Sequence, residues 1–399
     1  MTRQQAKRTP VGIGWQLSML TGWGVYGMNL SLQLEARGRL LPAPLVKPLM
    51  QGAFSPLHRV AIAPIVARFN EVAAALDSGG KRVECPYPVL HAVGDNLERL
   101  RATEHVSGTA NIAMAFFEDS AIDAMGLKQA ARYDVIVAGS TWNEEVLNRH
   151  GVPNVRKVLQ GVDPSVFHPA PKAGVFGHRF VVFSGGKLEY RKGQDIVVEA
   201  FRRFHGRHPD ALLLVAWQDV YRRGEFPGII LSGYVEGVPE ADETGGLAIA
   251  DWLRRNGLPN GSFVDLGAFA NVFGAQVVRE ADVALFPNRC EGGTNLVAME
   301  CMACGVPTIL SANTGHLDLI SPDRCFPLLG QAPAAAAKPG RNVDGWGESD
   351  VDEIIEALEV AYVDREEART RGRAAAAFMQ DWTWSKQTDR LLDALDPVI

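Results

Sequence analysis

Short apolar runs alternate with longer segments of helical periodicity along most of this chain. The clearest case begins with the apolar run Val283–Phe286, which a polar, glycine-containing turn follows. A helix is expected over about Leu296–Cys304, where Gly305 and Pro307 end it, and a second apolar run covers Thr308–Leu310. This order of strand, loop, helix and strand is typical of a parallel sheet with crossover helices. We therefore expect an α/β fold.

The same alternation continues in both directions from this unit. The other expected strands are Val11–Gly14, Pro88–Val93, Asn111–Phe117, Val135–Ala138, Phe180–Phe183, Ala211–Trp217 and Ser262–Leu266. The other expected helices are Met28–Arg37, His58–Leu76, Ser140–Arg149, Gln194–Phe204, Val351–Val363, Arg365–Met379 and a last one ending at Leu395. A chain of 399 residues favours two domains. The Pro- and Gly-containing segment Ala170–Gly177 indicates the linker between them.

Composition narrows the class of protein. The chain is 47% hydrophobic and 22% charged, which is ordinary for a globular protein. A formal net charge of −6 gives no sign of a nucleic-acid binder. No apolar run is long enough to span a bilayer, and the first residues lack the apolar core of a signal peptide. We expect a cytoplasmic protein, and a peripheral position on the inner face of the cell membrane is the alternative.

The turn before the expected helix has the chemistry of an anion site. Gly292 and Gly293 let the backbone approach a ligand closely. Thr294 or Asn295 can cap the helix, so that the free amides of its first turn and the helix dipole favour a negative charge.

Two carboxylates flank this turn. Glu291 precedes the expected helix and Glu300 lies inside it. An anion site between two acids suits a ligand with a phosphate and several hydroxyls, as a nucleotide-sugar has. An ordinary capped helix with a solvated acid near each end is the alternative interpretation.

The residues from Glu291 to Pro307, EGGTNLVAMECMACGVP, resemble the signature of family 4 retaining glycosyltransferases. That resemblance implies the GT-B fold, an α/β fold of two Rossmann-like domains whose parallel sheets face a central cleft. The family has seven residues between its two glutamates, whereas this chain has eight, 292–299. The extra residue falls in the Gly-Gly-Thr-Asn turn.

A second signature lies about a hundred residues earlier, where Lys187 ends the run SGGK and Lys192 lies in RKG. The family has an Arg followed, after a few residues, by Lys-Gly, and its two cations grip the donor diphosphate. Lys187 stands where Arg is usual, and Lys lacks the planar fork of Arg.

The resemblance also implies a set of site residues and a domain division. The catalytic residues would be Glu291, Lys192, Lys187 and Glu118, the last at the carboxyl end of an expected strand. The donor-binding residues would be Gly22, Gly24, Gly186, Gly267, Ala268, Gly292, Gly293, Thr294, Asn295, Leu296 and Glu300. The N-terminal acceptor domain would cover 1–172, with a C-terminal helix, 380–399, packing back on it, and the nucleotide-sugar domain would cover 173–379.

The implied reaction moves a sugar from a UDP- or GDP-sugar to a hydroxyl of a glycan, glycolipid or protein acceptor, with retention at the anomeric carbon. It would serve the synthesis of a cell-surface glycan or glycolipid. The nucleotide-sugar is a substrate, and no cofactor, metal or nucleic acid is expected. A sugar-nucleotide epimerase of the same fold and a catalytically silent nucleotide-sugar-binding subunit remain alternatives.

Four other patterns carry weaker hypotheses. The sequence GWGVYG, 22–27, matches GxGxxG, but no acid follows about 20 residues later for a dinucleotide ribose. Cys301 and Cys304 form a CxxC without a second pair. The DxD at 350–352 falls at an expected helix start, where acids cap.

The fourth pattern is a basic, apolar stretch over 36–70. Its basic residues are Arg37, Arg39, Lys47, His58, Arg59 and Arg68. A buried helix with a basic rim is the expected interpretation, and a surface for an anionic acceptor or anionic lipid is the alternative.

Overall fold

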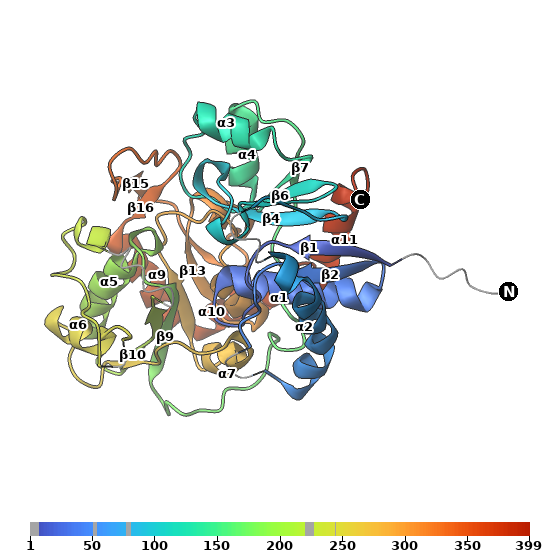
Figure 1. The fold of residues 1–399 in the computed structure, drawn as a ribbon. Coiled ribbons are helices and arrows are strands. Elements are labelled where there is room, and N and C mark those ends of the chain that lie inside the picture. Colours follow the sequence, from blue (N-terminus) through green and yellow to red (C-terminus); the bar gives the residue numbers. More distant parts are fainter. Residues whose placement is uncertain (1–7, 51–53, 77–80, 220–226, 244) are drawn as a thin grey trace. The chain divides into compact units, whose positions relative to one another are not determined.

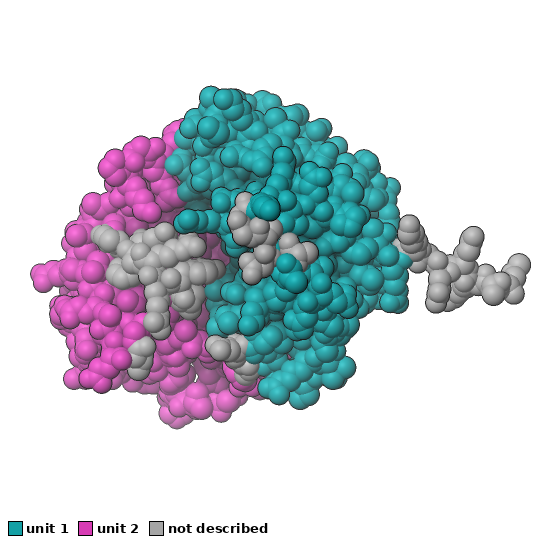
Figure 2. Space-filling view, in the orientation of Figure 1, with its two compact units in different colours: residues 1–163, 270–272, 382–399 teal, residues 164–269, 273–381 magenta. Residues whose placement is uncertain are grey.

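The computed structural model describes the chain except for short gaps, namely residues 8–50, 54–76, 81–219, 227–243 and 245–399. The chain divides into two compact units (Figure 2). Unit 1 comprises 1–163, 270–272 and 382–399, and unit 2 comprises 164–269 and 273–381.

Unit 1 is built on a parallel sheet. In spatial order its strands are β2 (Leu40–Pro44), β1 (Thr9–Ile13), β4 (Val89–Val93), β6 (Asn111–Ala115), β7 (Val135–Ala138) and β8 (Val155–Lys157). The central strands are buried on both faces, which explains why the sequence shows them as continuous apolar runs. Two short strands, β3 (Val83–Glu84) and β5 (Val106–Ser107), pair separately.

Helices cover both sides of this sheet (Figure 1). They are α1 (Gly22–Arg37), α2 (Pro56–Leu76), α3 (Ala124–Ala130), α4 (Thr141–Arg149) and α11 (Trp384–Leu395), with 3₁₀ turns η1 (Asp95–Leu97) and η2 (Arg101–Thr103). Asp123, Ser140 and Thr383 cap α3, α4 and α11 with their side chains.

The glycine-rich segment at 22–27, which precedes the helix expected over Met28–Arg37, is itself helical. The helix begins six residues earlier than expected because the Thr21 side chain accepts a hydrogen bond from the Gly24 amide and caps it. A Cβ at Gly27 would lie 2.4 Å from Nε1 of Trp15. This glycine therefore permits close packing inside unit 1.

The basic, apolar stretch also differs from its prediction. Helix α2 is not buried, since Leu57 and Val60 are 81% and 75% exposed. Its apolar residues occur all round the helix, and only the side that carries Ile62 and Ile65 is buried deeply. Three of the arginines are paired within unit 1, Arg37 with Asp389, Arg39 with Asp396 and Arg68 with Glu35. Contact with an anionic membrane stays a prediction.

Unit 2 contains a second parallel sheet. In spatial order its strands are β11 (Phe263–Asp265), β10 (Ala211–Gln218), β9 (Phe180–Lys187), β12 (Val283–Phe286), β13 (Thr308–Ser311) and β14 (Phe326–Leu328). The chain runs outward from β9 in one direction and then from β12 in the other, which is the Rossmann strand order. A small antiparallel pair, β15 (Gln331–Pro333) and β16 (Gly347–Ser349), is added.

The helices of unit 2 pack on its sheet and on one another. They are α5 (Gln194–Arg207), α6 (Ile249–Arg255), α7 (Gly274–Val278), α8 (Leu296–Ala303), α9 (Val351–Val363) and α10 (Arg365–Met379), with 3₁₀ turns η3 (Tyr190–Lys192), η4 (Pro227–Ile230), η5 (Asn271–Phe273, shared with unit 1) and η6 (Thr314–Asp318). Helix α5 packs on α9, and α8 packs on α10. Of the segment 220–243 that has no predicted role, 220–226 lies outside the described residues.

Two segments show how the chain passes between the units. The expected linker is fastened to unit 2, because the Glu280 carboxylate accepts hydrogen bonds from the backbone amides of 173–175 and Lys172 pairs with Asp282. After α10 the chain returns to unit 1, where Val162 forms a parallel bridge with Thr383. Helix α11 then packs on α1.

Candidate functional site

The two predicted signatures meet at the point in unit 2 where the strand order reverses. Strands β9 and β12 are neighbours there, and each ends in a loop at the same edge of the sheet. In open α/β sheets this edge, at the switch point, is the usual place for a ligand. Gly185 of β9 lies beside the first turn of α8, because a Cβ on it would be 3.1 Å from Cγ1 of Val297. The cations after β9 and the start of α8 therefore belong to one site.

The loop after β9 is held against the loop after β12 by backbone contacts. The Arg191 carbonyl accepts hydrogen bonds from the amides of Arg289, at 2.7 Å, and Cys290, at 3.2 Å. Gly193 has φ 68°, and a Cβ there would lie 2.2 Å from the Pro287 carbonyl oxygen. Only glycine allows the two loops to approach this closely.

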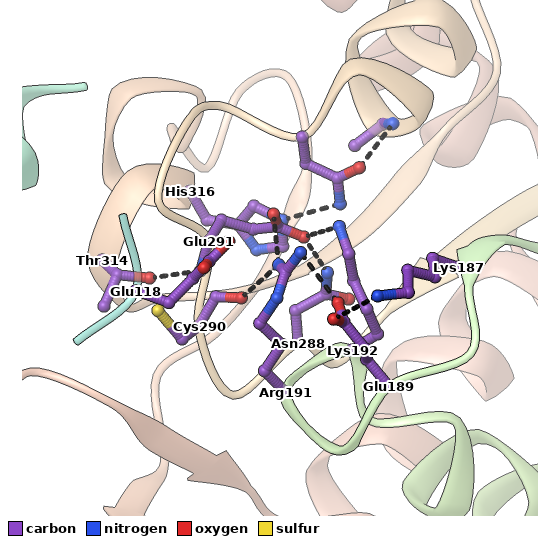
Figure 3. A network of polar contacts seen from close by, with 12 residues as sticks. Glu118, Lys187, Glu189, Arg191, Lys192, Asn288, Cys290, Glu291, Thr314 and His316 are labelled. Atoms are coloured by element: carbon purple, nitrogen blue, oxygen red, sulfur yellow. Dashed lines mark hydrogen bonds and ion pairs between the residues drawn. The ribbon is translucent and has the colours of Figure 1, made fainter. Parts of the chain in front are cut away.

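Glu291 lies at the centre of a cluster of polar side chains (Figure 3). Its Oε1 accepts hydrogen bonds from Nζ of Lys192 and Nδ2 of Asn288. Its Oε2 lies 3.1 Å from Nη1 of Arg191. The Glu291 backbone is fixed as well, since its amide donates to Oγ1 of Thr314 at 2.8 Å. The carboxylate is thus buried but fully supplied with donors.

The surrounding charges keep Glu291 ionised. Burial alone would raise the pKa of this carboxyl, but the positive charges of Lys192 and Arg191 lower the pKa below its ordinary value. Glu291 is therefore ionised at neutral pH, at the start of the loop that leads into α8.

Lys187 ends β9 and faces Glu189. Its Nζ lies 2.8 Å from Oε1 of Glu189, and Nη2 of Arg191 lies 2.9 Å from Oε2 of the same carboxylate. Burial favours a raised pKa for Glu189, but Arg191, Lys187 and Lys192 lower it to about 2. Three cations and two carboxylates thus occupy one cluster, which Figure 3 shows from close by.

The buried side chain of Arg289 connects the loop after β9 with the loop after β12. The Arg289 guanidinium donates to both oxygens of Asp195, at 2.8 and 2.6 Å, and to the Tyr190 carbonyl at 2.8 Å. It also pairs with Glu348 and stacks on the Tyr190 ring, 4.1 Å from its centroid. Because Asp195 is in the first turn of α5, this fork connects η3, α5 and the loop that carries Glu291.

The start of α8 has an unusual cap. Asn295 has φ 61°, and its Oδ1 accepts a hydrogen bond from the Ala298 amide, so Asn295 rather than Thr294 is the N-cap residue. Its Nδ2 lies 3.0 Å from Nε2 of His316. Burial lowers the pKa of His316 to about 4, so the neutral ring accepts this hydrogen bond and its Nδ1 can donate to the Ser311 carbonyl. The His316 ring therefore sets the orientation of the capping amide.

The predicted site residues fall in both units. Those in unit 2 are Gly186, Lys187, Lys192, Gly267, Ala268, Glu291, Gly292, Gly293, Thr294, Asn295, Leu296 and Glu300. Lys187, Lys192 and Glu291 share the cluster, and Glu300 is buried within α8. Gly22, Gly24 and Glu118 belong to unit 1, where the Glu118 amide donates to Asp95.

Several residues of the cluster were not predicted. They are Glu189, Arg191, Asn288, Arg289, Thr314 and His316. Arg191 and Glu189 lie within the second signature, between Lys187 and Lys192, and this position is the local signal that could have indicated them.

The weaker motifs have structural explanations. All five cysteines are buried, and none of them forms a disulfide. Burial raises the pKa of the Cys301 thiol well above its ordinary value and that of Cys304 to about 12, so both are neutral thiols. Asp350 accepts a hydrogen bond from the Asp352 amide and caps α9, as the capping interpretation predicted. No group of three His, Cys, Asp or Glu side chains suited to a metal ion occurs among the described residues.

Comparison with known proteins supports the predicted fold and the predicted resemblance to a family. The fold is GT-B, as predicted: a sucrose-phosphate synthase from Thermosynechococcus elongatus matches with a TM-score of 0.66 at 16% identity, covering 98% of this chain and 99% of that one. HepE from Anabaena, solved with UDP and glucose, matches with a TM-score of 0.63 at 12% identity, over 98% of this chain and 100% of that one.

The resemblance to family 4 glycosyltransferases is confirmed. A model of the family described as "Family 4 Glycosyltransferase in conflict systems" matches residues 271–391. A GDP-mannose-dependent alpha-(1-6)-phosphatidylinositol dimannoside mannosyltransferase from Mycobacterium tuberculosis is 28% identical over 210 residues, which are 50% of this chain and 47% of that protein. The chain thus spans about half the length of the first curated relatives it matches.

Within the described part of the chain, none of the helices has the length and apolar character needed to cross a bilayer.

Proposed function

We propose that this protein is a retaining glycosyltransferase that moves a sugar from a UDP- or GDP-linked donor to an acceptor hydroxyl. The observation that carries the proposal is the cluster of Lys187, Arg191 and Lys192 beside the first turn of α8, at the switch point of the unit 2 sheet. Cations and the backbone amides at a helix N-terminus are suited to a diphosphate. The GDP-mannose-dependent relative and the UDP-bound neighbour support a nucleotide-sugar as the donor.

In the proposed mechanism the protein stabilises the negative charge of the leaving diphosphate, and the donor's own phosphate accepts the proton of the acceptor hydroxyl. The acceptor hydroxyl attacks on the face from which the nucleoside diphosphate leaves, and the leaving phosphate oxygen takes the acceptor proton. The C1–O bond to the diphosphate breaks as the new glycosidic bond forms. Lys187, Lys192 and the amides of 292–296 stabilise the charge that develops on the diphosphate. No metal or other cofactor takes part in this proposal.

The acids have separate roles in this proposal. Glu291 accepts hydrogen bonds from the transferred sugar, and Glu300 accepts them from the ribose. Gly267 and Ala268, after β11, contact the nucleobase through their backbone. Glu118, Gly22 and Gly24 of unit 1 contribute to acceptor and donor binding. The acceptor is a glycan, glycolipid or protein hydroxyl, and the phosphatidylinositol mannoside of the relative's name favours a polyol or glycolipid.

Incubation of the purified protein with a panel of UDP- and GDP-sugars tests this proposal. The two measurements are release of the nucleoside diphosphate and the NMR spectrum of the remaining sugar nucleotide. We expect slow release of UDP or GDP from one donor, which an added acceptor accelerates. An altered sugar nucleotide without release would indicate an epimerase, and binding without turnover would indicate a silent subunit. The Mycobacterium tuberculosis relative is a mannosyltransferase, which favours transfer.

A further inference from the structure

A carboxylate that the proposed reaction does not use lies among the proposed phosphate-binding cations. Glu189 comes directly before η3, and its two oxygens are 2.8 Å from Lys187 and 2.9 Å from Arg191. The Glu189 side chain is 14% exposed, and both cations are similarly sheltered. The carboxylate therefore occupies a protected position that the phosphates of a donor would compete for.

The other two acids of this region are bound more completely. Asp195 is fully buried and accepts two hydrogen bonds from Arg289 and one from Ser232. Glu291 has the three side-chain donors described above. Oε2 of Glu189, in contrast, accepts no aligned hydrogen bond from the described residues, although it faces Arg191. Nor does the Glu189 side chain cap η3. Its side-chain contacts are the ion pair with Arg191 and the ion pair with Lys187, which also donates a hydrogen bond to Oε1, and another anion can replace both.

We propose that Glu189 is the resident counter-ion of the diphosphate subsite, which holds Lys187 and Arg191 until a nucleoside diphosphate takes its place. This inference rests on the proposed function of the cluster. Once displaced, the carboxylate stays a few ångströms from the bound phosphates and repels them. Glu189 thus lowers the affinity for nucleoside diphosphate and speeds release of this product, a step that often limits turnover.

The ionisation of Glu189 agrees with this role. Its lowered pKa, about 2, means that the carboxylate is charged at any pH at which the protein would work. The effect of Glu189 on phosphate binding is therefore that of a permanent negative charge.

Calorimetric titration with UDP, GDP and the two nucleosides tests the proposal on the whole chain. The variants are Glu189→Gln and Glu189→Ala, which remove the charge, and Glu189→Asp, which keeps it. Glu199→Gln is the matched control, because Glu199 of α5 is similarly buried and also bridges two arginines, Arg202 and Arg203. Thermal unfolding verifies that each variant is folded.

We expect Glu189→Gln and Glu189→Ala to bind the preferred nucleoside diphosphate about tenfold more tightly, which corresponds to about 1.4 kcal/mol. The nucleoside, which has no phosphate, should bind equally to all variants, and Glu189→Asp and Glu199→Gln should resemble the wild type. Stopped-flow displacement should show slower release of the diphosphate from both charge-removing variants.

Two results would overturn the counter-ion role. One is an unchanged or weaker affinity for the diphosphate in the charge-removing variants, and the other is a gain of the same size for the nucleoside. If neither UDP nor GDP binds the wild type or any variant, the proposed function of the cluster itself is wrong, and the counter-ion role is wrong with it.

Discussion

Replacing Arg289 with methionine should destabilise unit 2 and weaken the site at the same time. The Arg289 side chain is fully buried and donates a hydrogen bond to each carboxylate oxygen of Asp195, which is also fully buried. Methionine fills much of the space but leaves the Asp195 carboxylate, among the described residues, with only the side-chain hydrogen bond from the Ser232 hydroxyl. Breaking a buried ion pair by removing one partner costs about 3–5 kcal/mol, because the other charge stays buried.

The measurement is urea-induced unfolding followed by tryptophan fluorescence. Arg255→Met is the control, because Arg255 and its partner Glu240 are 47% and 75% exposed, and such a surface pair contributes about 1 kcal/mol or less. The double variant Arg289→Met/Asp195→Asn removes the unpaired charge, so its loss of stability should be smaller than the sum of the two single losses.

The single variant Arg289→Met should also bind nucleoside diphosphate less tightly. Arg289 helps to hold the loop of Glu291 against the loop of Arg191 and Lys192. A loss of stability no larger than that of Arg255→Met would refute the claim that the Arg289–Asp195 ion pair connects the two loops. Full nucleotide affinity in a folded Arg289→Met variant would refute its positioning role alone.

Three further predictions concern the roles of Glu291 and Glu300, the independence of the activity from a metal ion, and the ionisation of Glu189. Glu291→Gln should lower kcat together with kcat/KM, whereas Glu300→Gln should raise KM for the donor with little change in kcat; donor-saturation curves decide, and the reverse pattern would exchange the two roles. Activity should survive excess EDTA; loss that Mn²⁺ or Mg²⁺ restores would contradict the metal-free mechanism. Because the folded-state pKa of Glu189 is lowered from about 4.5 to about 2, its stabilisation is present above pH 4.5 and is lost as the pH falls towards 2. Glu189→Gln should therefore flatten the fall of the unfolding temperature over this pH range, and parallel curves would refute the ion pairing.

Elements with a strong local pattern could be predicted from the sequence. The continuous apolar run Val283–Phe286 and the helices Val351–Val363 and Arg365–Met379 have the bounds expected. The apolar residues of the two helices recur with a helical period, and the side chains of Asp350 and Asp364 cap their first turns.

Strand β2 was missed because Pro42 and Pro44 argue against a strand. Proline is tolerated at the edge of a sheet, and β2 is the edge strand next to β1. Strand β9 was expected to end at Phe183, but pairing with β10 continues as far as Lys187 opposite Gln218. In both cases the neighbouring strand, which no local pattern reveals, decides the structure.

The candidate site shows the same limit. Lys187, Lys192 and Glu291 were named from signatures that are local in sequence. Their partners were not, because Arg289 and Asp195 are 94 positions apart and Arg191 and Glu291 are 100 apart. Contacts of this kind depend on the fold that brings β9 beside β12. Glu189 lies within the second signature, but its ion pairs become evident only from the side-chain positions.

The central claim is that Lys187 and Lys192 hold the diphosphate of a nucleotide-sugar during transfer. The most direct test is kcat/KM for the donor identified in the panel, compared between the wild type, Lys187→Ala and Lys192→Ala. Lys172→Ala is the control, because Lys172 pairs with Asp282 away from the cluster. A charge-assisted hydrogen bond is worth about 1.5–3 kcal/mol, so each cluster variant should lose about 10- to 150-fold in kcat/KM while its unfolding temperature shows an intact fold. Wild-type kcat/KM in both cluster variants would contradict the claim.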